Sequence, residues 1–404
     1  METVLLNLMD RANLIRYIDF EVSSLCNAGC SVCPRRNHGH FSEFTQTYWT
    51  LEDTKRVIDT NIISNLHSVL FCGNFGDAMG NPDISKIGRY FRDNNNRMSI
   101  HVKTNGGIGD PKLYREMAKL GAVFTFGLDG VGEKNELYRV NVKWDNVLRN
   151  VEEFTKNCAS SQFEIQFIMW NETTDQIIPM IDFLKSIGKG SLYLRKPYTS
   201  GEDETEVHNM KGESTHFLTE IQDERLEKYF ETKWKFNQLD GLKNEIESLD
   251  LEVPKIKSGT YEISKHRQNK EKTYEYSEVK FSEKEINELN KINKQTCFSK
   301  NSDNPLDLTK EAFNIFITHN KMLMPCCFIP PNISNEMYHS TGYESPRQRE
   351  MLNKMLDIGF NEFSLKDKTL REVFNNKILD KFVYDDLING TQFSICKTMC
   401  GKCE

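Results

Sequence analysis

Three cysteines near the N-terminal end of the chain are the residues most able to carry chemistry. Cys26, Cys30 and Cys33 stand in the run CNAGCSVCPR, with the spacing Cys-x3-Cys-x2-Cys. Three thiolates so close together can hold three irons of a cubane cluster, which normally takes four cysteine ligands. The fourth iron would then be open to a ligand that is not protein. The alternative is a structural zinc site with four protein ligands, which His38 or His40 could complete.

Alternating strand-like and helix-like segments between residues 17 and 198 would position these cysteines. Strands are expected over residues 17–22, 68–74, 98–105, 122–130, 163–170 and 191–198, and helices over 50–62, 84–94, 111–121, 147–157 and 173–188. Six β/α units in succession predict a parallel sheet covered by helices. The pattern permits either a partial barrel or an open, doubly wound sheet. In both, chemistry lies at the carboxyl ends of the strands, and Cys26 follows the first of them.

Polar and glycine-containing segments follow the next strands. They are CGNFGDAMGNPD, KTNGG, GLDGVGEKNELYR and WNE, in chain order. Together with the cysteine triplet, these segments resemble the cofactor loops of the radical S-adenosylmethionine (radical SAM) superfamily. The resemblance implies an α/β fold for residues 1–200, a partial (β/α)6 TIM-like barrel.

The resemblance also implies the cofactors and the residues that hold them. A [4Fe–4S] cluster on the three cysteines would bind S-adenosylmethionine (SAM) at its open iron. Its electron would cleave SAM to a 5'-deoxyadenosyl radical that abstracts hydrogen from a substrate. The residues implied for SAM binding are Gly73, Asn74, Gly76, Asp77, Thr104, Asn105, Asp129, Arg139 and Asn171. Asp77 would replace the usual glutamate beside the SAM amine, and Arg139 would bind the SAM carboxylate.

Each of these loops also has a structural interpretation. Ala78 stands where the family has proline, so the segment around Asp77 could be only a glycine-rich turn between a strand and a helix. Gly127 stands where the family has serine. Arg139 could be a solvated surface arginine, and Asp129 could be structural or face the substrate.

Six further cysteines lie between residues 297 and 403. The run AFNIFITHNKMLMPCCF predicts a hairpin that turns at His319 and Asn320, and residues 364–390 predict helices. This order resembles the SPASM and twitch domains, so residues 296–404 are expected to form a small, cysteine-rich α+β domain with one auxiliary [4Fe–4S] cluster. Its ligands would be Cys297, Cys326 and two or three of Cys396, Cys400 and Cys403. A zinc site on the same thiols is the alternative.

The stretch between these two parts differs in character. Residues 201–216 read as an acidic loop, and residues 219–249 and 282–294 as amphipathic, charged helices. Residues 201–295 are therefore expected to be a charged helical insertion. It could cover the mouth of the barrel or be a solvated appendage.

Composition limits the classes of function. The chain has 404 residues and a net charge of −7, which gives no general attraction to nucleic acid or to an anionic membrane. The N-terminal segment reads as neither a signal peptide nor a membrane span, so we expect a cytoplasmic protein. Thiols stay reduced there, and eleven cysteines then indicate metal binding or catalysis rather than disulfides. Cys72 is expected to be a core thiol of its strand, and Cys158 an inert free thiol near the end of a helix.

The expected function is that of a radical SAM enzyme of oxidoreductase or peptide-modifying type. SPASM-type relatives often act on ribosomally made peptides, so the expected substrate is a peptide that is oxidised, crosslinked or epimerised. The auxiliary cluster would transfer electrons, and an external donor such as flavodoxin or ferredoxin would reduce the protein. The alternatives are dehydrogenation of a small metabolite and a non-enzymatic zinc or iron–sulfur scaffold.

Overall fold

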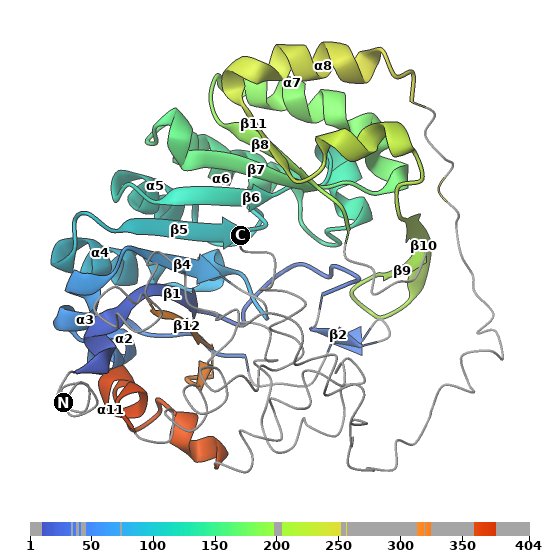
Figure 1. The fold of residues 1–404 in the computed structure, drawn as a ribbon. Helices are drawn as coiled ribbons and strands as arrows, with labels where there is room; N and C mark the ends of the chain where they lie inside the picture. Colours follow the sequence, from blue (N-terminus) through green and yellow to red (C-terminus); the bar gives the residue numbers. More distant parts are fainter. Residues whose placement is uncertain are drawn as a thin grey trace, which may run out of the picture.

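A nine-stranded sheet organises the part of the chain that the structure describes (Figure 1). The structure is a computed structural model that describes residues 10–33, 35–37, 40–41, 46–72, 75–197, 204–251, 256, 313–318, 320–324 and 359–376. The strands of the sheet are β1 (Ile15–Glu21), β4 (Ser68–Cys72), β5 (Ser99–Thr104), β6 (Val123–Gly127), β7 (Phe163–Ile168), β8 (Ser191–Arg195), β11 (Thr232–Lys235), β12 (Phe313–Ile317) and β13 (Leu323–Met324).

The strand order is β11-β8-β7-β6-β5-β4-β1-β12-β13. All neighbours from β8 to β12 are parallel, and β11 and β13 add antiparallel edges. The six predicted strands are therefore confirmed as β1 and β4 to β8. Their carboxyl ends share one edge of the sheet, as a parallel arrangement requires.

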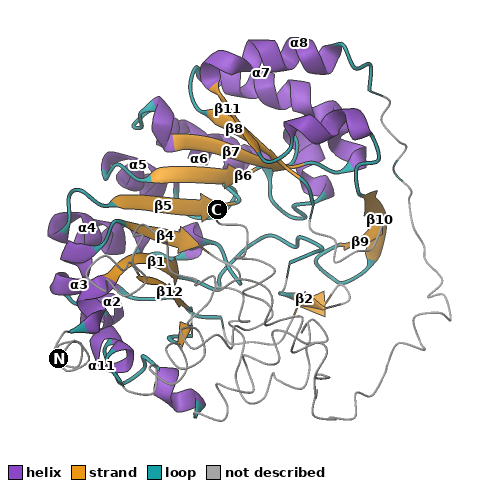
Figure 2. Cartoon of the chain, in the orientation of Figure 1, coloured by secondary structure: helices purple, strands orange, loops and turns teal. Residues whose placement is uncertain are grey.

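The helices distinguish the partial barrel from the doubly wound sheet. They are α2 (Leu51–Val57), α3 (Thr60–Asn65), α4 (Ile84–Asn94), α5 (Pro111–Lys119), α6 (Trp144–Thr155), α7 (Ile177–Ile187), α8 (Leu239–Glu247) and α11 (Leu370–Phe374). Helices α2 and α3 each touch α4, α4 touches α5, and α5 touches α6, and Figure 2 shows these helices along one side of the sheet. Helix α7 continues the row, because Trp144 of α6 meets Phe183 of α7 with ring centroids 5.3 Å apart. A doubly wound sheet would divide its helices between two faces. One continuous row indicates the wall of a TIM-like barrel.

Capping side chains set where several helices begin. Asp110 accepts the backbone N–H of Lys112 at the start of α5, next to Pro111, as the sequence predicted. The single helix predicted over residues 50–62 is wrong, because two helices, α2 and α3, occupy it. Asp59 has an extended backbone and caps α3 through the N–H groups of Asn61 and Ile62, which interrupts the helical path.

Strands occupy much of the stretch after residue 203, where the sequence predicted a loop and helices. A hairpin of β9 (Glu204–His208) and β10 (Ser214–Thr219) replaces the predicted loop. Strand β11, predicted as helix, alternates half-buried Thr232 and Trp234 with exposed lysines and pairs with the edge of β8. This alternation of half-buried and exposed residues, which is typical of a strand, prevailed over the helical sequence pattern on either side of β11. The helix prediction holds for α8, whose buried Leu239, Leu242 and Ile246 share one face.

The hairpin predicted near residue 319 is confirmed as β12 and β13. Strand β12 lies parallel to β1, so it extends the barrel sheet. The Trp49 indole N–H donates to the carbonyl of Thr318 at 3.0 Å, and Arg371 of α11 forms an ion pair with Asp59 at 2.8 Å. The predicted auxiliary ligands Cys297, Cys326, Cys396, Cys400 and Cys403 lie outside the described residues. The domain boundaries at residues 200 and 295 stay predictions.

Aromatic side chains fill the core between the sheet and the helices. Phe20 meets Trp49 with centroids 4.9 Å apart, and Phe124 of β6 meets Phe154 of α6 at 4.3 Å. Shorter elements complete the description: η1 (Arg11–Leu14), β2 (Arg36–Asn37), β3 (His40–Phe41), η2 (Ala78–Gly80), η3 (Gly132–Leu137), η4 (Ser160–Gln162), η5 (Asn171–Gln176), η6 (Glu224–Tyr229), η7 (Phe236–Gln238) and η10 (Phe360–Phe363). Among the described helices, none has both the length and the apolar character needed to cross a membrane.

Candidate iron–sulfur and cofactor site

The cysteine loop, residues 22–33, leaves the carboxyl end of β1 and is tied to the loops that follow three other strands. After β4, the N–H of Asp77 donates to the carbonyl of Leu25 at 2.8 Å. After β5, the carbonyl of Gly107 accepts the side-chain amide of Asn27 at 3.1 Å. After β6, the carbonyl of Val140 accepts the N–H of Gly29 at 2.9 Å. The loop therefore lies at the strand-end edge where the sequence predicted it.

The three thiols lie close enough to influence one another. Burial, aided by the Asp77 carboxylate, raises the pKa of Cys26 to about 12. Burial also raises the pKa of Cys30 to about 11, and Cys33 acts in the same direction while Arg139 opposes it. These thiols would keep their protons unless a metal supplied positive charge, which reverses the local preference.

Cys30 is buried and the other two cysteines are half-buried. Within the described ranges, no three His, Cys, Asp or Glu side chains are grouped so as to hold a metal ion. The donor set nevertheless suits an iron–sulfur cluster in kind, because three thiols lie in one loop and Cys30 interacts with both Cys26 and Cys33 beside the Arg139 guanidinium.

Asp77 connects two of the strand-end loops. Its Oδ1 accepts the N–H of Met79 at 3.0 Å and its Oδ2 accepts the N–H of Asn105 at 2.7 Å. Burial raises the pKa of this carboxyl although both donors lower it. Gly76 lies so close to the cysteine loop that a Cβ there would stand 2.1 Å from the carbonyl oxygen of Ser23. Gly73 and Asn74 lie outside the described residues.

The two polar residues at the end of β5 have internal partners. The Thr104 hydroxyl lies 3.3 Å from the Tyr114 hydroxyl and accepts the N–H of Gly106 at 3.1 Å. The Asn105 side chain is 4% exposed and reaches the cysteine loop, where its Nδ2 lies 3.5 Å from Sγ of Cys26. The structure thus places Asn105 against a predicted cluster ligand.

Arg139 and Asp129 form a buried ion pair with Nε and Oδ2 2.6 Å apart. The Arg139 side chain is only 14% exposed, so the interpretation as a solvated surface arginine is wrong. Burial lowers the pKa of Arg139, but Asp129, Cys30 and Tyr138 together outweigh burial and raise that pKa, so Arg139 stays charged. A Cβ on Gly127 would stand 2.5 Å from Nη2 of Arg139. Glycine at the family's serine position therefore makes room for the guanidinium.

The segment after β7 holds a predicted residue and one that sequence reasoning missed. Asn171 begins η5 and is half-buried. The next residue, Glu172, is 4% exposed and accepts both the N–H and the hydroxyl of Thr219, at 2.9 and 2.7 Å. His216 also approaches the carbonyl of Leu137, at 2.9 Å. These contacts fasten β10 over the ends of β6 and β7. The signal for Glu172 in the sequence was a carboxylate a few residues after the buried strand β7.

Two other charged residues near the cysteines were missed. Glu21, the last residue of β1, is fully buried and accepts the N–H of Phe75 at 2.7 Å. Arg35 is 4% exposed and donates to the carbonyls of Cys26 and Ala28, each at 3.3 Å. A glutamate inside an apolar strand and an arginine two residues after Cys33 were the signals in the sequence.

The remaining described cysteines are core thiols by burial. Cys72 and Cys158 are 8% and 9% exposed. Both lie outside the cysteine loop, in β4 and after α6 respectively.

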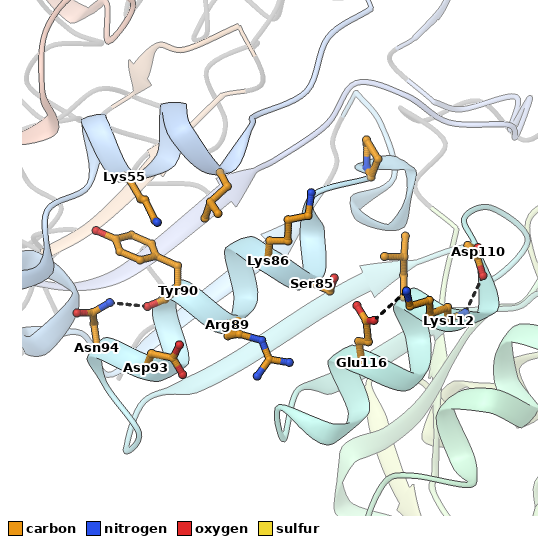
Figure 3. A pocket seen from close by; sticks show the side chains of 13 residues that line it. Lys55, Ser85, Lys86, Arg89, Tyr90, Asp93, Asn94, Asp110, Lys112 and Glu116 are labelled. Carbon is orange, nitrogen blue, oxygen red and sulfur yellow. Dashed lines mark hydrogen bonds and ion pairs between the residues drawn. The ribbon is translucent and has the colours of Figure 1, made fainter.

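Two cavities flank the barrel, and they differ in their relation to the cysteine loop. A cavity of about 440 Å³ opens beside it, lined in part by Asn27, Gly107 and Asn141. A larger one, of about 710 Å³, lies among α2, α4 and α5 on the helical side. Figure 3 shows it, with Lys112 paired to Glu116 at its wall. No predicted site residue lines the larger cavity, so it is not part of this site.

The similarity of this chain to curated proteins and to solved structures is low. No curated protein matches the sequence. Among solved structures, SuiB of Streptococcus suis is similar at 14% identity and a TM-score of 0.42, over 80% of this chain and 63% of SuiB, so the chain spans less than two thirds of SuiB. Native anSMEcpe with bound AdoMet and Cp18Cys peptide is similar at 12% identity and a TM-score of 0.41, over 92% of this chain and 98% of that chain.

A family model matches the segment that carries the site. Residues 20–185 match the Radical SAM superfamily. The matched segment includes the cysteine loop, strands β4 to β7 and the loops after them. The superfamily uses a [4Fe–4S] cluster together with SAM. The similarity to this superfamily therefore covers the part of the chain that contains the cysteine loop and the strand ends around it.

Proposed function

We propose that this protein is a radical SAM enzyme that abstracts hydrogen from a peptide and leaves it oxidised, crosslinked or epimerised. One observation carries the proposal: the cysteine loop follows β1 and is hydrogen-bonded to the loops after β4, β5 and β6. In this arrangement a group bound at the cysteines lies beside the strand ends, where parallel α/β folds place their chemistry.

The proposal assigns each cofactor to residues at these strand ends. Cys26, Cys30 and Cys33 would ligate a [4Fe–4S] cluster, and the cluster with SAM would supply a 5'-deoxyadenosyl radical. We assign the SAM amine to the loop of Asp77 and the SAM carboxylate to Arg139. Arg139 meets Asp129 through Nε, so its terminal nitrogens are the groups suited to a second carboxylate.

The peptide substrate and the auxiliary cluster rest on the order of sequence features after residue 296. A hairpin, a Pro-Cys-Cys run, helices and a terminal cysteine group occur in the order of SPASM and twitch domains. We propose that these cysteines hold one auxiliary cluster, that flavodoxin or ferredoxin supplies electrons, and that the protein is cytoplasmic.

Anaerobic reconstitution with iron and sulfide tests the radical chemistry. The protein is then mixed with dithionite and SAM, and iron per chain and 5'-deoxyadenosine are measured. We expect about eight irons per chain. A variant with Cys26, Cys30 and Cys33 changed to Ala should keep about four irons and form no 5'-deoxyadenosine. The matched control is Cys158→Ala, which removes a buried thiol outside the loop and should change neither value. Bound zinc, or a fully loaded protein that forms no 5'-deoxyadenosine, would refute the proposal.

Isotope transfer tests the substrate class. The reconstituted protein is given either deuterated peptides from a digested proteome or a deuterated small-metabolite fraction. Deuterium in 5'-deoxyadenosine from the peptides supports the proposal. Transfer from the metabolite fraction alone would replace the peptide with a small molecule.

A further inference from the structure

The side-chain amide of Asn105 lies between two strand-end loops and contacts a cysteine of the proposed cluster. Its Nδ2 lies 3.5 Å from Sγ of Cys26 and 3.0 Å from Oδ1 of Asn27. An amide NH2 group has two N–H bonds. One N–H can thus bond to Sγ of Cys26, and the other can bond to Oδ1 of Asn27, the next residue of the cysteine loop.

Neighbouring groups fix which end of the amide faces the sulfur. Oδ1 of Asn105 accepts the backbone N–H of Gly107 at 2.7 Å. A backbone N–H can only donate, so the oxygen must face Gly107 and the NH2 group must face Cys26. The backbone of Asn105 is held as well, because its N–H donates to Asp77 at 2.7 Å. The donor therefore stays directed at the sulfur before any cofactor is present.

From this geometry, and resting on the cluster of the proposed function, we infer that Asn105 is a positioning residue that raises the reduction potential of that cluster. Reduction adds negative charge that the ligand sulfurs share, and an N–H donor bonds more strongly to a more negative acceptor. Hydrogen bonds to the sulfurs are among the features that set cluster potentials. The N–H of Ala28, 3.4 Å from the same Sγ, is a second donor. Cys26 is thus a ligand at which the protein makes the reduced state easier to reach.

The test compares midpoint potentials of the full-length, reconstituted protein. Two variants remove the donor. Asn105→Leu removes the whole amide, and Asn105→Asp keeps an oxygen for Gly107 but places a carboxylate beside the sulfur. The matched control is Asn150→Leu. Asn150 is also a buried asparagine and holds the same loop through the carbonyl of Gly106 at 2.8 Å.

Potentials are read from the electron paramagnetic resonance signal of the reduced cluster during an anaerobic titration. The signal that changes when SAM is added identifies the N-terminal cluster. We expect Asn105→Leu to lower the equilibrium constant for reduction about tenfold, a midpoint shift of about 59 mV for one electron. Asn105→Asp should shift it at least as far in the same direction, and Asn150→Leu should leave it unchanged.

The outcomes separate this inference from the proposed function. If the parent protein forms no iron–sulfur cluster, the proposed function fails and the inference fails with it. If the variants load fully and keep the parent potential, only the inference is overturned. An equal shift in Asn150→Leu would also overturn it, because the effect would then come from the loop. If Asn105→Leu does not fold, Asn105→Asp decides.

Discussion

Replacing Arg139 with methionine would leave the buried carboxylate of Asp129 without its positively charged partner. The change therefore measures how much unfolding free energy that buried charge costs when it is unpaired. Asp129 is 0% exposed and its Oδ2 lies 2.6 Å from Nε of Arg139. Methionine preserves an unbranched chain but removes the positive charge. Asp129 would then keep only the N–H of Ile168, which its Oδ1 accepts at 2.6 Å.

The expected loss of unfolding free energy follows from these contacts. Removing one partner of a buried ion pair costs about 3–5 kcal/mol. Arg139 is 14% exposed and Asp129 keeps one donor, so we expect the lower end, about 3 kcal/mol. Changing Asp129→Asn in the same background removes the buried charge and should recover about 2 kcal/mol.

The loss should also depend on pH. Burial raises the pKa of Asp129, and Arg139 acts against that shift. Without Arg139 the folded-state pKa rises further above its unfolded value. A group of this kind contributes stability below its unfolded pKa and loses it as the pH rises through its folded pKa. The deficit of Arg139→Met should therefore be smaller at about pH 5 than at about pH 7.

Urea denaturation followed by tryptophan fluorescence measures these values. Trp170 packs against Tyr138, the neighbour of Arg139, with ring centroids 5.3 Å apart, so it reports on this region. The matched control is Arg149→Met, an exposed arginine on α6, which should change stability by less than about 0.5 kcal/mol. The reasoning would be refuted if Arg139→Met caused the same loss with Asn at position 129 as with Asp.

Two further substitutions test the packing around the site. Gly127→Ala places a Cβ 2.5 Å from Nη2 of Arg139 and should lower the unfolding free energy by about 1–3 kcal/mol, measured by urea denaturation; an unchanged value would show that the guanidinium moves freely. Glu172→Leu removes both bonds to Thr219, so limited proteolysis within residues 204–219 should become faster, whereas Glu172→Gln, which keeps one acceptor, should fall between it and the parent. Equal cleavage in all three proteins would mean that other contacts hold the hairpin.

The sequence was sufficient for the six parallel strands β1 and β4 to β8 because their signals are local. Each buried parallel strand forms a short apolar run, and residues such as Asp110 mark where a helix begins. Local patterns did not predict the pairing of strands whose partners lie far away in the sequence. Strand β12 joins β1 across almost 300 residues, and β11 is fixed by the edge of β8. No local pattern contains the partner of such a strand.

The candidate site, like the fold, could be predicted from the sequence only in part. The spacing of Cys26, Cys30 and Cys33 identified three thiols of one loop, and the strand ends identified the neighbouring loops. The contacts of Asn105 with Cys26 and of Asp77 with Asn105 could not be read from the sequence. They depend on the order β1-β4-β5 in the sheet and on which loop bends toward which, and both are set by the whole fold.

The hydrogen bonds around the cysteine loop indicate that its neighbours act as one unit. Asp77 gives its N–H to Leu25 and accepts that of Asn105, so a single residue joins the loops after β1, β4 and β5. The side chain of Asn141 adds the segment after β6 by donating to the carbonyl of Asn27 at 2.9 Å. Asp77 and Asn105 are buried, and leaving a buried polar group without its partner costs about 1–3 kcal/mol. Movement of one loop would break bonds in the others, so the cysteine loop keeps its shape only if all four strand ends keep theirs. This explains why an aspartate can stand at position 77: its short side chain bonds directly to the backbone of two loops, a structural role that is independent of any ligand.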